Sequence, residues 1–205
     1  CQAYQWAAQF PDMVKSILPF CASAKTSIHN HVFLEGIKAA LVADKNWNNG
    51  DYKSPPVAGL KAFGRVYAGW AFSQDFFRQE LFKKIGFNNA EELLKDWEND
   101  HVKNWDANNL LCKLKTWQMS DISAGPIYKN DFTEALKSIS AKAILMPCNQ
   151  DLYFRTKDNE VESKHIKNSV LKPIDSPFGH CAANPGNDKN FESQLDKNIN
   201  ELLNK

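Results

Sequence analysis

The sequence has 205 residues, with 25 basic and 24 acidic side chains, and its formal net charge is +1. This balance excludes a protein that binds nucleic acid through a strongly basic surface, and a hydrophobic content of 43% excludes wholesale disorder. Apolar runs stay well below the roughly 18 residues that a membrane-spanning helix needs.

The chain opens in the middle of a helical pattern. Residues 2–10 contain no helix breaker before Pro11, and no Ser, Asp or Asn precedes them as an N-cap. The first residue is Cys1 in place of Met. We therefore expect these residues to be the later part of a longer protein.

Short apolar runs alternate with helical patterns toward both ends of the chain. The predicted strands are residues 16–21, 143–147 and 170–174. The predicted helices around them are residues 2–10, 28–43, 132–139, 158–166 and 191–203. Strands that alternate with helices through short loops are typical of an α/β fold with a parallel sheet.

A helical insertion interrupts this alternation. A loop at residues 44–56 carries Asn-Gly and Pro-Pro turn signals, and helical spacing of apolar residues then continues from Val57 to about Ile122. We expect breaks between its helices at Gly69, at residues 86–89 and at Asn108–Asn109.

The cysteines and histidines show no metal-binding spacing. Five cysteines are scattered without a C-x-x-C pair, and five histidines form no H-x-x-x-H pair. This pattern predicts reduced thiols in a cytoplasmic protein, and we expect no metal site.

Two loops after predicted strands carry groups suited to proton transfer. Asp151 follows the strand at 143–147, and Gly179-His180 follows the strand at 170–174. Because binding crevices of parallel sheets lie at the carboxyl ends of the strands, we expect the two side chains to meet. His180 would move a proton while Asp151 fixes its tautomer. The alternatives are a loop-capping Asp and a turn His.

Further motifs extend this pattern to a family resemblance over essentially the whole chain. The segments that carry it are Gln2-Ala-Tyr-Gln-Trp6, Phe10-Pro-Asp-Met-Val14, Thr26-Ser27 with Glu35, Asn46-Trp47-Asn-Asn-Gly50-Asp-Tyr52, Asp106-Ala-Asn108, Asp151-Leu-Tyr-Phe154 and Gly179-His180. Together they resemble the C-terminal portion of the homoserine O-acetyltransferase-like family of α/β-hydrolases, whose triad members follow the order Ser, Asp, His.

The resemblance implies an α/β-hydrolase fold with a helical cap and with the N-terminal part of the sheet missing. It divides the chain into core at residues 1–56, cap at 57–125, and core with the triad Asp151 and His180 at 126–205. The nucleophilic Ser would lie four residues before Cys1.

The cap contains candidate substrate-binding residues. Aromatic side chains, among them Tyr67 and Trp70, would line a tunnel for the acyl substrate, or would simply pack the cap. Arg65 lies inside an apolar run and would bind a substrate carboxylate, or else form a structural salt bridge.

The implied activity is acyl transfer to water or to an alcohol, with acetyl-CoA as donor in the transferase case and no bound cofactor. Cys181 stands where homoserine-acetylating members carry an acid after the triad His, which argues against homoserine as acceptor. The implied partners are small molecules, with neither nucleic acid nor membrane, in a cytoplasmic protein. The oligomeric state is open, with a homodimer as one option. The alternative is a truncated or inactive member that acts as a binding module.

Overall fold

The computed structural model describes residues 1–184 and 186–203, and it separates into two compact units. The sheet unit comprises Cys1–Lys25 and Ser120–Lys205, and the helical unit comprises Thr26–Met119.

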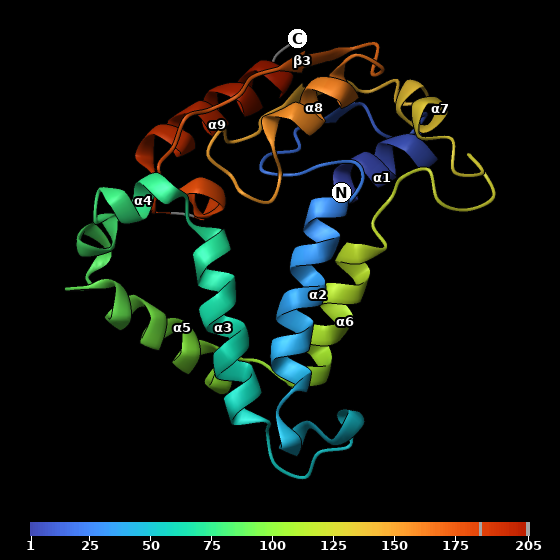
Figure 1. Ribbon diagram of the computed structural model, residues 1–205. Helices are drawn as coiled ribbons and strands as arrows, with labels where there is room; N and C mark the ends of the chain where they lie inside the picture. The colour runs from blue at the N-terminus through green and yellow to red at the C-terminus, as the bar shows by residue number, and fades with distance from the viewer. Residues whose placement is uncertain (185, 204–205) are drawn as a thin grey trace. The chain divides into compact units, whose positions relative to one another are not determined.

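The sheet unit contains a parallel sheet in the order β1-β2-β3. Its elements are α1 (Gln2–Gln9), β1 (Ser16–Ile17), α7 (Phe132–Lys137), β2 (Lys142–Leu145), α8 (Thr156–Ser163), β3 (Ser169–Leu171), the 3-10 helix η3 (Gly179–Ala183) and α9 (Lys189–Leu203). All three predicted strands and their flanking helices are therefore present (Figure 1). β1 is shorter than expected because Pro19 has no N–H for the ladder, and pairing resumes at the bridge between Phe20 and Met146.

The core of the sheet unit lies between strands and helices. Small residues at Ala7 and Ala8 let α1 approach the sheet closely, and Leu136 and Ile139 cover it from α7 and the turn that follows. Burial of these apolar side chains is the main stabilising contribution to this unit.

The helical unit is built from α2 (Ile28–Val42), the 3-10 helix η1 (Lys45–Gly50), α3 (Val57–Ala71), α4 (Gln74–Arg78), the 3-10 helix η2 (Leu81–Ile85), α5 (Ala90–Asn104) and α6 (Ala107–Gln118). α3 packs against α2 and α5, and α2 lies beside α6 (Figure 1). Four of these α-helices start at a side-chain N-cap that accepts a backbone N–H: Ser27, Ser73, Asn89 and Asp106.

Two predicted breaks inside the helical unit are wrong. Gly69 lies within α3, because no atom crowds it and a single glycine does not end a strongly periodic helix. Asn108 and Asn109 lie within α6, since the Asp106 carboxylate accepts the Asn109 N–H and so begins the helix earlier. The break falls at the extended residue Trp105.

The two units have different bounds from the predicted core and cap. α2 groups with the helical unit because it packs against α3 and α6. The division at residues 56 and 125 stays a prediction for the whole protein. Among the described residues, no helix has the length and apolarity needed to cross a membrane.

Candidate active site

Asp151 and His180 come from adjacent loops at the carboxyl edge of the sheet. The first loop follows β2, and the second follows β3. Asn149 joins the loops, because its backbone N–H donates to the Ile174 carbonyl at 2.8 Å and its Nδ2 donates to Asp175 Oδ1 at 2.8 Å. Two hydrogen bonds from Asn149 thus cross-link the loops that carry Asp151 and His180.

The carboxylate of Asp151 is buried and held by backbone groups. Its Oδ1 accepts the N–H groups of Tyr153 at 2.7 Å and Phe154 at 3.2 Å. Its Oδ2 lies 2.8 Å from Nδ1 of His180, and the Asp151 side chain is fully inaccessible to solvent. Because Oδ1 is held by two backbone N–H groups, Oδ2 is the oxygen that faces the imidazole of His180.

The imidazole of His180 is fixed on one side and open on the other. The ring lies 5.1 Å from the Tyr153 ring and 5.5 Å from the Phe154 ring, and its side chain is 32% exposed. Gly179 adopts a φ of 62°, a left-handed conformation that favours glycine at the start of η3. Because an ionised Asp151 only accepts hydrogen bonds, Nδ1 carries the proton and Nε2 is left to act as a base.

Sequence reasoning missed Cys21, which follows β1 at the same edge of the sheet. One ligand atom each of Cys21, Asp151 and His180 lies within 4.8 Å of the others. Cys148 and Cys181 are buried nearby in the two loops, and burial raises the pKa of Cys181 to about 12. The usable signal was the position of Cys21 at the carboxyl end of the predicted strand 16–21.

A second buried carboxylate was also missed. Glu162 Oε1 accepts the Ala24 N–H at 2.7 Å, and Oε2 accepts Tyr4 Oη at 2.7 Å and Asn159 Nδ2 at 2.6 Å. Burial raises the pKa of Glu162 to about 7. This network joins α1 to α8 and to the segment after β1, and so fixes the helix that follows the expected nucleophile.

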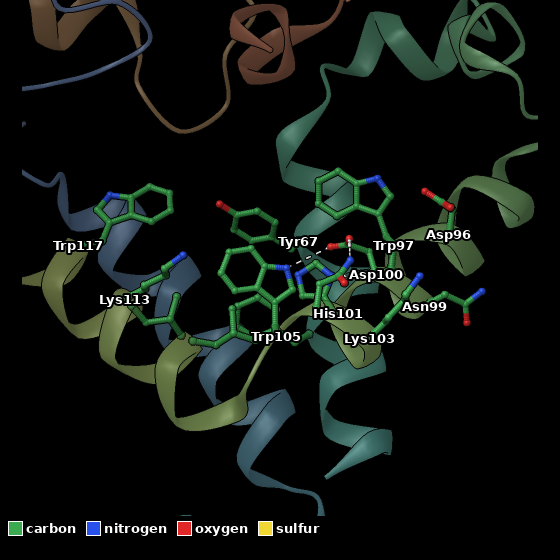
Figure 2. Close-up of a pocket in the computed structure, with 14 residues that line it drawn as sticks. Tyr67, Asp96, Trp97, Asn99, Asp100, His101, Lys103, Trp105, Lys113 and Trp117 are labelled. Carbon is green, nitrogen blue, oxygen red and sulfur yellow. Dashed lines mark hydrogen bonds between the residues drawn. The ribbon is translucent and has the colours of Figure 1, made fainter. Parts of the chain in front are cut away.

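The helical unit contains an aromatic cavity of about 650 Å³ between α3, α5 and α6. Its ring-bearing lining residues are Phe63, Tyr67, Trp97, His101, Trp105 and Trp117. In Figure 2, Tyr67 and Trp105 lie between Trp97 on α5 and Trp117 on α6. The Lys113 ammonium lies 3.9 Å from the centre of the Trp105 ring, and the Trp105 Nε1 donates to Asp100 at 3.1 Å.

The three predicted substrate-binding residues have different surroundings. Tyr67 lines this cavity, whereas the Trp70 ring packs 4.7 Å from the ring of Phe33. Arg65 forms ion pairs with Glu91 and Glu98. These contacts favour the salt-bridge interpretation for Arg65.

Known proteins similar to this chain include esterases. It is 32% identical over 204 residues to the "probable esterase" of Corynebacterium glutamicum and, over the same length, to an ethyl acetate hydrolase of Pseudomonas veronii. Each alignment covers 98% of this chain, and the chain spans 58% of the length of these relatives. The homoserine O-acetyltransferase of Chloroherpeton thalassium is 28% identical over 87% of this chain.

Solved structures agree with these relatives. The acetyl esterase MekB superposes with a TM-score of 0.94 at 32% identity, covering all of this chain and 59% of the esterase chain. No protein-family model matches the sequence. The chain is a homologue of these esterases and homoserine O-acetyltransferases, and its fold is that of the C-terminal part of an α/β-hydrolase.

Proposed function

We propose that the protein containing this chain hydrolyses short acyl esters through a serine intermediate. His180 serves as general base and acid, and Asp151 orients it. The observation that carries this proposal is the 2.8 Å contact between His180 Nδ1 and the buried Asp151 carboxylate, with the opposite face of the imidazole partly open to solvent.

The chemistry follows from the tautomer. Nε2 takes the proton of the serine hydroxyl as its oxygen attacks the ester carbonyl, and it gives that proton to the departing alcohol. The buried Asp151 carboxylate stabilises the imidazolium between these steps. Water then attacks the acyl-serine with His180 again as base. By the family resemblance, the serine lies four residues N-terminal of Cys1.

Two observations favour water over an alcohol as the acceptor. The two relatives at 32% identity carry the names of hydrolases, whereas the homoserine O-acetyltransferase stands at 28%. In addition, Cys181 provides no charge after His180 for the amino group of homoserine. O-acyl transfer from acetyl-CoA is the second candidate, supported by the relationship to homoserine O-acetyltransferases.

The substrates in this proposal are small molecules, and no bound cofactor is required. Tyr67 and Trp70 contribute apolar surface for the acyl group or the alcohol, and Arg65 has a structural role through Glu91 and Glu98. The five free thiols fit a cytoplasmic protein. A homodimer is part of this proposal.

The test is turnover by the full-length protein. We expect hydrolysis of ethyl acetate and p-nitrophenyl acetate, and a loss of about 10³-fold or more in kcat for His180→Ala. Acetyl-CoA consumption that depends on an added alcohol would favour the transferase. No turnover and no labelling by a fluorophosphonate would support the alternative of an inactive binding module.

A further inference from the structure

We propose that Cys21, Asp151 and His180 form a binding site for a thiophilic divalent cation such as Zn²⁺. These residues follow the carboxyl ends of β1, β2 and β3, and one ligand atom of each lies within 4.8 Å of the other two. A thiol, a carboxylate and an imidazole make up a ligand set of the kind that zinc prefers.

The distances suit a tetrahedral ion. Zinc bonds of about 2.0–2.3 Å place neighbouring ligand atoms about 3.3–3.6 Å apart. The ligand atoms at this edge are separated by between 2.8 Å, from His180 Nδ1 to Asp151 Oδ2, and 4.8 Å. Side-chain movements of about 1 Å therefore produce the required geometry.

Groups around the three ligands already set their orientation. Tyr153 and Phe154 N–H groups hold Asp151 Oδ1, so that Oδ2 is the oxygen aimed at the site. Cys21 has a φ of 43°, and its N–H donates to the Met146 carbonyl at 3.1 Å. A left-handed conformation costs a non-glycine residue energy, and such positions concentrate at functional sites. Supporting contacts of this kind orient metal ligands in proteins.

The net charge of the cluster also favours a divalent cation bound by a thiolate. A neutral thiol, a carboxylate and a neutral imidazole together carry one negative charge. Zn²⁺ replaces the thiol proton, which goes to solvent, and the proton on His180 Nδ1 is exchanged for one on Nε2. The occupied cluster then holds a 2+ ion, a thiolate and a carboxylate, and it is neutral overall.

Occupancy has a consequence for catalysis that rests on the proposed function. An ion between Nδ1 and Oδ2 separates the two atoms and places the proton on Nε2, where the base must be free. The site is therefore inhibitory, and an enzyme held by Zn²⁺ regains activity when a chelator removes the ion.

The direct test is Co²⁺ titration of the full-length protein, followed by the thiolate-to-cobalt charge-transfer absorption. We expect a band that Zn²⁺ displaces and excess Mg²⁺ does not. The band should be absent in Cys21→Ser, whose Zn²⁺ affinity should fall by at least about 100-fold, since loss of a supporting residue alone costs 10–100-fold. Cys112→Ser, which changes an exposed thiol, and Cys181→Ser, which changes a buried one, should keep the band.

A measurement on the unaltered protein tests the site without depending on the folding of a variant. Zn²⁺ should protect Cys21 from slow alkylation, read by mass spectrometry, and should leave Cys112 reactive. No cobalt–thiolate band, or a band that persists in Cys21→Ser, overturns the site. A protein that shows the cobalt–thiolate band but hydrolyses no ester would support the metal site and contradict the proposed function. A protein that hydrolyses esters but shows no band would support the proposed function and contradict the metal site.

Discussion

The sheet unit buries carboxylate side chains, whereas the helical unit buries none among the described residues. In the sheet unit, Asp151 and Glu162 are buried, and each carboxylate is surrounded by several donors. In the helical unit, ion pairs such as Arg78 with Asp75 lie at the surface, and aromatic rings fill the interior. A buried, fully paired carboxylate is costly to rearrange, whereas an exposed pair contributes little.

This contrast says where substitutions should matter most. Changes to buried polar groups of the sheet unit should remove activity or much stability. Changes in the helical unit should act through packing, and its surface charges should matter least.

The largest effect is expected at the pair of Asp151 and His180. Asp151→Asn should lower kcat by about 10³–10⁴-fold, because an amide stabilises the wrong imidazole tautomer and leaves the imidazolium without a counter-charge. Ester hydrolysis by the full-length protein measures this. Thermal unfolding serves as the control for folding, and a loss below tenfold would break the assignment.

Glu162 should have the next largest effect, on stability. Glu162→Ala removes the acceptor of the Ala24 N–H and of Tyr4 Oη, and one of the acceptors of Asn159 Nδ2, at a cost of about 3 kcal/mol. Urea unfolding measures this. Retention of full stability would show that the network does not hold α1.

Glu162 also predicts a pH dependence. Its pKa is about 7 in the folded protein against an ordinary 4.5, so the folded state binds the proton more tightly. The contribution of Glu162 to stability therefore decreases as pH rises from about 4.5 to 7, by about 3 kcal/mol. Glu162→Gln, which mimics the protonated form, should lack this decrease. Parallel pH profiles for both proteins would contradict it.

Two glycines of α3 provide a matched pair for the helical unit. A Cβ at Gly64 would lie 2.8 Å from the Trp97 carbonyl oxygen, whereas nothing lies within 4 Å of a Cβ at Gly69. Gly64→Ala should destabilise by about 1–3 kcal/mol through overpacking, and Gly69→Ala should stabilise by about 0.5–1 kcal/mol. Denaturant unfolding distinguishes them, and equal effects would refute close packing of α3 on α5.

Arg65 should give the smallest effect. Since its guanidinium is exposed and pairs with Glu91 and Glu98, Arg65→Met should change KM for a neutral ester by less than about twofold. A large rise in KM for a carboxylate-bearing ester alone would restore its role in substrate binding.

The sequence predicted the α/β alternation because strands and helices differ in their apolar period. It also placed Asp151 and His180 after strands, where position in the chain determines position at the sheet edge. It could not place Glu162, because its partners Tyr4 and Ala24 lie far away in sequence and no local spacing records such contacts. The predicted helix boundary at Asn108–Asn109 was wrong, because the N-cap at Asp106 begins α6 before these two asparagines.

The central claim is that His180, oriented by Asp151, activates a serine. Its most direct measurement is the rate of fluorophosphonate labelling of the full-length protein, with the labelled residue located by mass spectrometry. We predict one labelled serine N-terminal of Cys1 and a labelling rate at least about 10³-fold lower in His180→Ala. Equal rates in the two proteins, or a label within the 205 residues, would contradict the account.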